Sequence, residues 1–306
     1  MVVASEHMSI DRPSHPRADD PAEIRITTEI DNAVRSTELG RNMFGEVDRL
    51  QRAYFQQALV LEDPQAVHDL TQQLLENLSL ATNSHIIDGE EHLATLEKRT
   101  PVLAVVNHFS AYKLTLIPYR DLGLDPNGKS RQIEPFPIFY APVMPVAKAL
   151  GDKLYDGHME VDNPQIKRIQ EAAGTIIVPD PAKLPRDPET QKPVPTFPIV
   201  LERTKEHFAE HPDTLLVSFS EGETSGKRNG GGPYHLAEFK TGAFVSAAAV
   251  AAPVLPVCMY FNPNSGFEIG ILEPFYPEPD KEREYYQQLA EDTRQKMQAW
   301  LDQKSA

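Results

Sequence analysis

The sequence predicts an α/β protein whose mixed, mostly parallel sheet is flanked by helices and preceded by an N-terminal helical extension. From Pro101 onward, short apolar runs alternate with helical segments, which is typical of α/β proteins. The runs are Val102 to Val106, Ile176 to Val178, Leu215 to Phe219 and Val254 to Tyr260. Between about Ile24 and Leu96, apolar residues recur at spacings of three and four, which indicates amphipathic helices.

We divide the chain into three parts. Residues 1–22 are polar and rich in proline, so they bury too little apolar surface to offset the entropy of ordering, and we expect a flexible tail. Residues 23–98 form the helical region, whose apolar faces we expect to pack on one another or on the following domain. Residues 99–306 form the α/β domain. Within it, the proline-rich stretch Pro179 to Pro198 predicts a long loop, and Lys281 to Leu301 predicts a charged helix that docks on the domain.

Composition excludes several classes of protein. The 306 residues include 30 Lys and Arg against 45 Asp and Glu, and the formal net charge of −15 opposes nucleic-acid binding. The single cysteine, Cys258, lies in an apolar run, which excludes disulfide scaffolds and cysteine-based zinc sites within one chain. No stretch approaches the ~18 consecutive apolar residues that a membrane span requires. We therefore expect a cytoplasmic protein whose membrane contact is at most peripheral.

Candidate functional residues follow two of the predicted strands. Asn107 and His108 close the apolar strand 102–106, and Glu221 and Gly222 follow the strand 215–219. Ligands of open α/β sheets bind at the carboxyl ends of the strands. We therefore expect His108 and Glu221 to lie at one edge of the sheet, on a shared site.

Four blocks in this part of the chain resemble the motifs of the glycerolipid acyltransferase superfamily, in the lysophosphatidic acid acyltransferase-like branch, and they occur in the family's order. They are Asn107-His108, the loop Phe219 to Ser225, the block Phe239-Lys240-Thr241-Gly242-Ala243-Phe244, and Pro253 to Val257. The likeness covers roughly Pro101 to Pro274. A weaker block, Gly157 to Asn163, resembles the family's acceptor-binding motif.

The resemblance implies that His108 is a general base, which removes a proton from the acceptor as the acceptor attacks an acyl thioester. The implied donor is acyl-CoA or an acyl chain on the phosphopantetheine of an acyl carrier protein, and no metal or redox cofactor is bound. The implied acceptor is a small molecule or a lipid. The resemblance also places the following residues at the substrate: Asn107, Lys113, Gly157, Asn163, Gly222, Thr224, Ser225 and Lys240.

One departure concerns the base itself. The family has an aspartate five positions after the histidine, where it orients the imidazole as in a serine-protease triad, and this sequence has Lys113. A cation about 6 Å from His108 would oppose the imidazolium by about 2.8 kcal/mol at an effective dielectric of about 20. Three explanations stay open. Another carboxylate serves, Lys113 turns outward to bind an anionic substrate group, or the site is catalytically degenerate.

Glu221 is our preferred substitute carboxylate, because the resemblance places it across the same pocket from His108. A structural role, in which its carboxylate ties down its own loop through backbone amides, is an equal alternative. The other carboxylates considered are Asp156, Glu160, Asp162 and Glu223.

A second departure concerns the acceptor. Two family arginines that bind a glycerol phosphate are replaced by Asn163 and Thr224, and arginine suits phosphate because its fork makes bidentate bonds. We therefore expect a non-phosphorylated alcohol or amine as the acceptor. Replacement charge for a phosphate could come from Lys113, Lys227, Arg228 or Lys240.

Two other functional classes stay open, and one motif is set aside. A catalytically silent protein that binds acyl chains or an acyl carrier protein would explain the departures, and thioester hydrolysis is a third possibility. The segment His207 to His211 matches the His-x-x-Glu-His pattern of inverted zinc proteases, but a charged surface helix that runs from Ile199 to Pro212 explains the same residues.

Overall fold

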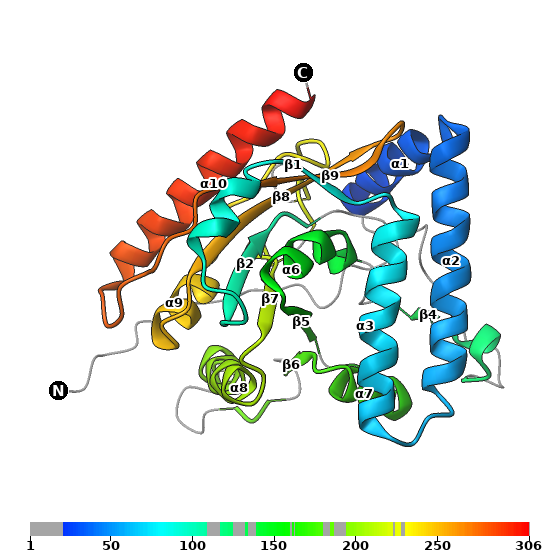
Figure 1. Ribbon diagram of the computed structural model, residues 1–306, viewed down its shortest axis with the longest axis horizontal. Helices are drawn as coiled ribbons and strands as arrows, with labels where there is room; N and C mark the ends of the chain where they lie inside the picture. The colour runs from blue at the N-terminus through cyan, green and yellow to red at the C-terminus, as the bar shows by residue number, and fades with distance from the viewer. Residues whose placement is uncertain are drawn as a thin grey trace.

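The computed structural model describes residues 21–108, 117–124, 132–133, 139–159, 161, 163–179, 184–186, 194–222, 224–227 and 230–305. A seven-stranded sheet with the order β1-β9-β8-β2-β7-β5-β6 forms its centre (Figure 1). All neighbouring strands in this sheet are parallel except β8 and β9, which are antiparallel. The predicted mixed, mostly parallel sheet flanked by helices is confirmed. The seven strands are β1 (His85–Asp88), β2 (Val102–Val106), β5 (Lys153–Met159), β6 (Ile176–Val178), β7 (Thr214–Ser218), β8 (Val254–Asn262) and β9 (Gly266–Ile271).

Helices cover both faces of the sheet. One face packs against α1 (Pro21–Arg35), α2 (Glu38–Ala58), α3 (Pro64–Ala81), α6 (Met144–Leu150) and α7 (Pro164–Ala172). The other face packs against α8 (Phe197–Glu210), α9 (Gly242–Ala249) and α10 (Arg283–Ser305). Figure 1 shows α2 and α3 side by side on the first face, and α10 running along β8 on the second. Smaller elements are β3 (Ile117–Pro118), β4 (Gln132–Ile133) and the 3-10 helices η1 (Glu90–Thr95), η2 (Tyr119–Leu122) and η3 (Ala141–Val143).

The side chains of the central strand β2 contribute alternately to the cores on the two faces of the sheet. All five of its residues are buried, as expected for a parallel strand covered on both sides. Because successive side chains point to opposite faces, Ala104 and Val106 contribute to the core under α2 and α3, while Leu103 and Val105 contribute to the core under α9 and α10. The same alternation aims the side chain of residue 108 at the first face.

The helices of the N-terminal region begin at clear capping signals. The side chain of Thr37 accepts a hydrogen bond from the Gly40 amide at the start of α2, and Asp63 accepts one from the Gln65 amide at the start of α3. Buried residues such as Phe55 in α2 and Leu75 in α3 then join the core of the first face. The expectation that these helices pack on each other and on the α/β domain is confirmed.

The chain departs from the helical expectation at β1, which lies inside the range 23–98. Residues His85–Asp88 pair with β9 in parallel, and Ile86 and Ile87 pack on opposite faces of the sheet. The alternation of these two side chains between the faces is the two-residue period of a strand, not that of a helix. As a strand, the segment pairs with β9 and covers an edge of β9 that would otherwise be open. Helix α1 begins at Pro21, so the expected boundary at residue 22 falls in its first turn, and residues 1–20 lie outside the described residues.

The C-terminal half of the chain tests the remaining expectations about its helices and loops. The final helix docks through Tyr286, Met297 and Trp300, so its predicted docking is confirmed, and Cys258 is fully buried. The stretch Pro179 to Pro198 is described only in part, and α8 begins within its end at Phe197. Within the described residues, no helix is both long and apolar enough to cross a membrane.

A glycine lets the final helix lie close to the sheet. Gly270 in β9 faces the indole of Trp300, and a Cβ atom built on Gly270 would lie 2.2 Å from Trp300 Cε2. The indole cannot easily move aside, because it is 6% exposed and its Nε1 donates a hydrogen bond of 3.0 Å to Asp88 Oδ2. One contact therefore joins β9, β1 and α10.

We predict that Gly270→Ala lowers the free energy of unfolding by about 1–3 kcal/mol, because the added methyl group overpacks this contact. Gly45→Ala is the matched control, since a Cβ atom there meets nothing within 4 Å and alanine favours the interior of α2 by about 0.5–1 kcal/mol. Urea unfolding of both variants checks the prediction. Equal stability of the two variants would contradict it.

Candidate functional site

His108 lies just beyond the carboxyl end of β2, and its neighbour fixes where the strand ends. The side-chain amide of Asn107 donates to the Met259 carbonyl at 3.0 Å and accepts from the Met259 amide at 2.7 Å. Asn107 thus extends the pairing of β2 with β8 by one step and is itself fully buried. This structural role places His108, which is partly exposed, at the strand-end edge of the sheet.

The loop after β7 binds the backbone of His108 in both directions. The His108 amide donates to Ser225 Oγ at 3.1 Å, and the Ser225 amide donates to the His108 carbonyl at 3.2 Å. The Ser225 hydroxyl in turn donates to Glu221 Oε1 at 2.5 Å. The two motif blocks therefore meet at one edge of the sheet, as expected from the parallel neighbours β2 and β7.

Glu221 is fully buried, and both of its carboxylate oxygens accept hydrogen bonds within the loop. Besides the bond from Ser225, Oε2 accepts a 2.7 Å hydrogen bond from the Ala237 amide. These contacts match the role of a carboxylate that ties down its loop. A direct contact of Glu221 with the imidazole of His108 stays a prediction.

Gly222 and Lys240 lie together on the same loop system. Gly222 has a φ of +69°, and a Cβ atom there would lie 3.1 Å from Lys240 Nζ. The Lys240 amide donates to the Ser220 carbonyl at 2.8 Å, which joins the third block to the second. The backbone conformation at position 222 thus favours glycine, and a Cβ atom there would crowd the lysine side chain.

Two aromatic rings contact the imidazole of His108. The ring centroid of Phe219 lies 4.4 Å from that of His108 at an interplanar angle of 45°. The ring centroid of Phe139 lies 5.1 Å away at 47°. Both phenylalanines are partly buried against the core of the first face, so the imidazole sits in partly apolar surroundings.

The acceptor-motif positions have local roles. Asn163 caps α7, where its Oδ1 accepts from the amides of Gln165 at 2.9 Å and Ile166 at 3.2 Å. Thr224 is buried, with 7% of its surface exposed. Gly157 lies in β5, where it pairs with Ile176 of β6. The structure thus brings together Asn107, His108, Glu221, Gly222, Ser225 and Lys240, and places Gly157 and Asn163 on the strand beyond β7 and the helix that follows it.

Five residues named from the sequence lie outside the described residues. They are Lys113, Glu160, Asp162, Glu223 and Arg228. The orientation of Lys113 relative to His108 therefore stays a prediction.

Asp156 is buried on the same sheet face as His108 but is too distant to pair with its imidazole. Asp156 and Ala104 both register with Val217, so two strand spacings and four residues separate it from His108. This separation corresponds to about 16 Å between backbones. Burial raises the pKa of Asp156 to about 8, and the side chain of Thr175 offsets part of that increase.

The His-x-x-Glu-His segment packs against an aromatic side chain. The rings of His207 and His211 lie 4.6 Å and 5.6 Å from the Tyr155 ring, and burial lowers the pKa of His207 to about 4. Among the described residues, no group of three or more His, Cys, Asp or Glu side chains is arranged to hold a metal ion.

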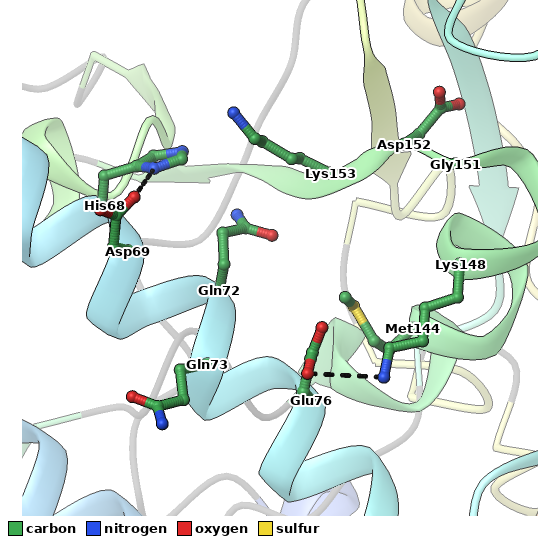
Figure 2. Close-up of a pocket in the computed structure, with 10 residues that line it drawn as sticks. All are labelled: His68, Asp69, Gln72, Gln73, Glu76, Met144, Lys148, Gly151, Asp152 and Lys153. Carbon is green, nitrogen blue, oxygen red and sulfur yellow. Dashed lines mark hydrogen bonds and ion pairs between the residues drawn. The ribbon is translucent and has the colours of Figure 1, made fainter.

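A groove of about 510 Å³ lies at the opposite edge of the sheet, where β5 begins (Figure 2). Several of its polar groups already have partners. Gln72 bonds the backbone of Leu154, Lys148 lies 3.5 Å from Glu76, and His68 Nε2 lies 3.0 Å from the Tyr155 hydroxyl. We therefore keep the candidate site at the edge that bears His108. The groove is lined by His68, Asp69, Gln72, Gln73, Glu76, Met144, Lys148, Gly151, Asp152 and Lys153.

The chain has a structural likeness among solved structures. No protein-family model matches the chain, and no curated protein matches it. The chain is similar to the crystal structure of the 1-acyl-sn-glycerophosphate (LPA) acyltransferase, PlsC, from Thermotoga maritima. The two share 14% sequence identity, the match covers 85% of this chain and 96% of that chain, and the TM-score is 0.45. A likeness of this degree carries no functional argument, so the case for a function rests on the residues of the site.

Sequence reasoning missed the two phenylalanines as neighbours of the imidazole. The position of Phe219 in the sequence indicated a place at the site, because it directly follows β7 and directly precedes the loop that carries Glu221. Nothing in the sequence indicated that Phe139 contacts His108, since Phe139 comes from a distant segment just before η3.

We predict that Ser225→Ala lowers the free energy of unfolding by about 1–3 kcal/mol, because it leaves the His108 amide and a buried Glu221 oxygen without their hydroxyl partner. Ser36→Ala is the control, since that hydroxyl bonds a carbonyl at an exposed turn, and its effect should stay within about 0.5 kcal/mol. Chemical denaturation measures both. A Ser225→Ala variant as stable as the control would be inconsistent with the buried link.

Asp156 should make stability depend on pH. Its folded-state pKa is raised from 3.8 to about 8, so its contribution is fully present below the unfolded value and is lost as the pH rises to about 8. We predict that Asp156→Asn removes this loss, which amounts to about 1.4 kcal/mol per pH unit across that window. Urea unfolding of wild type and variant near the two ends of the window checks it. The prediction fails if the difference in stability between variant and wild type is the same at both ends.

Proposed function

We propose that the chain is an acyltransferase that moves an acyl group from a thioester to a hydroxyl or amine acceptor, with His108 as the general base. The observation that carries the proposal is the two-way bonding of Ser225 to the His108 backbone, which joins the two motif blocks that would bear the chemistry. The partial exposure of His108 at the strand-end edge supports it, because a base has to reach the acceptor.

The reaction proceeds as follows for an alcohol. His108 takes the proton of the acceptor hydroxyl while the oxygen attacks the thioester carbonyl, so a carbon–oxygen bond forms. The tetrahedral intermediate then collapses, the carbon–sulfur bond breaks, and the leaving thiolate takes the proton from the imidazolium. The products are an ester and a free thiol. The donor is acyl-CoA or an acylated carrier protein, and no bound metal or redox cofactor is needed.

The acceptor is proposed to lack a phosphate group. Asn163 occupies a position where the family has an arginine, and its side-chain oxygen is used to cap α7. Thr224, at the second such position, is a buried neutral side chain. Neither provides the bidentate charged contact that suits a phosphate.

A second candidate function is binding of an acyl chain or an acyl carrier protein without turnover. It is favoured by Lys113 at the position of the family's aspartate and by the loop-tying contacts of Glu221. Incubation with acyl-CoA and acyl carrier protein thioesters, with and without alcohols and amines, separates the candidates. Thiol release that depends on the acceptor indicates transfer, release without an acceptor indicates hydrolysis, and binding without release indicates the silent protein.

We predict that His108→Ala lowers kcat for acyl transfer by about 10²–10⁴. The melting temperature should stay close to that of wild type, because the residue is partly exposed and its bonds to Ser225 are made by the backbone, which the alanine variant keeps. His92→Ala, in η1, is the matched histidine control and should keep full activity. Lys113→Asp and Glu221→Gln complete the set. A large gain from Lys113→Asp with full kcat in Glu221→Gln would favour the degenerate site. Unchanged turnover in His108→Ala would refute the assignment of the base.

A further inference from the structure

The rings of Phe139 and Phe219 lie within the distance at which an aromatic ring stabilises a cation. Their centroids lie 5.1 Å and 4.4 Å from the centroid of the His108 imidazole. A cation that lies over the face of a ring, within about 6 Å of its centroid, is attracted by the negative charge of that face. The neutral imidazole lacks that charge and gains much less. The two rings therefore discriminate between the protonation states of one side chain.

The backbone holds all three rings in place. Phe219 directly follows β7, and its carbonyl accepts a 2.8 Å hydrogen bond from the Gly222 amide. Phe139 directly precedes Tyr140, which is 2% exposed, so its backbone is anchored in the core. The backbone of His108 is bonded to Ser225 on both sides. The contact is thus a built arrangement of three separate segments.

Base catalysis makes this discrimination useful. During turnover the neutral imidazole becomes an imidazolium as His108 takes the acceptor's proton, so an interaction that favours the charged form lowers the barrier to that step. In a triad the third carboxylate provides this stabilisation. Here the corresponding position is Lys113.

We propose that Phe139 and Phe219 are positioning residues that stabilise the imidazolium form of His108 through their π faces and supply part of what a triad carboxylate supplies. The inference rests on the proposed function of His108 as the base. It assigns a role to two uncharged residues of the site. If the inference is correct, the protonation of His108 depends on the electron density of the two rings and not only on their shape.

Charged and titratable groups on the elements around His108 have to be kept constant in any test. The loop after β7 carries Glu221 and Lys227, the segment before α9 carries Lys240, and Tyr140 follows Phe139. Lys113 belongs to the same region of the sequence. A test that changes only the electrons of the phenylalanine rings leaves all of these groups as they are.

Fluorination of a single phenylalanine meets that condition, because mono-, di- and trifluorophenylalanine keep nearly the same shape while the π face loses negative charge. We would place the series at position 219 and, separately, at position 139 of the full chain. The titration midpoint of the His108 imidazole is followed by NMR, with its signal assigned by its absence in His108→Ala. The kcat for thiol release in the presence of an acceptor is measured on the same samples.

We expect both quantities to fall stepwise with fluorination. At the trifluoro end the titration midpoint should be lower by about 0.5–1.5 pH units, and kcat should fall about three- to thirtyfold for each ring. Phe219→Leu and Phe139→Leu should reach at least the same loss. KM should change little, because the proton transfer to His108 follows the binding of the substrates.

Fluorination of Phe267 is the control. This ring packs against Phe261 in the core, and its fluorination should leave the midpoint and kcat unchanged. A flat series at both positions 139 and 219 overturns the inference, even if the leucine variants lose activity, because it would show that only shape matters. If the wild-type chain transfers no acyl group, the proposed function fails, while the titration series still decides whether the rings stabilise the imidazolium.

Discussion

The hydroxyl group of Ser225 connects the parts of the candidate site. It accepts the His108 amide and donates to the buried Glu221 carboxylate, whose second oxygen holds the backbone at Ala237. The end of β2, the loop after β7 and the segment before α9 are therefore held by one chain of hydrogen bonds. A carboxylate buried in this way is favourable only when its lone pairs are satisfied, so each member of the chain depends on the others.

Much of the site was predictable from the sequence, because the relevant residues directly follow apolar runs. Asn107 and His108 end β2, and Glu221 follows β7, so the geometry of a parallel sheet was enough to place them together. Strand β5 was not predicted, since Lys153, Asp156 and Gly157 interrupt its apolar pattern. The neighbours β7 and β6 stabilise it as a strand through pairing that no local pattern reveals.

Side-chain roles were harder to predict than positions. Asn163 belongs to a block associated with the acceptor, but in the structure it is a helix cap. Pro164 follows it at the first helical position, and the Asn163 side chain accepts hydrogen bonds from the amides of Gln165 and Ile166. The contact of Phe139 with His108 joins segments that are distant in the chain, and only the packed structure reveals it. The helix cap at Asn163 is a local feature that could be recognised from the Asn-Pro pair. The contact between Phe139 and His108 depends on tertiary packing.

The pairing of β1 with β9 has a consequence for how the chain matures during its synthesis. β1 and β2 emerge early, but their partners β7, β8 and β9 are encoded near the other end of the sequence. At ~5–20 residues per second, the ribosome needs on the order of ten to forty seconds to add the residues between β1 and β9. Until β7 has been synthesised, the Val102–Val106 segment is an apolar strand without neighbours, the type of segment that can pair with other chains. The sheet can close only after translation has passed β9, and until then the nascent chain carries strands that lack part of their pairing.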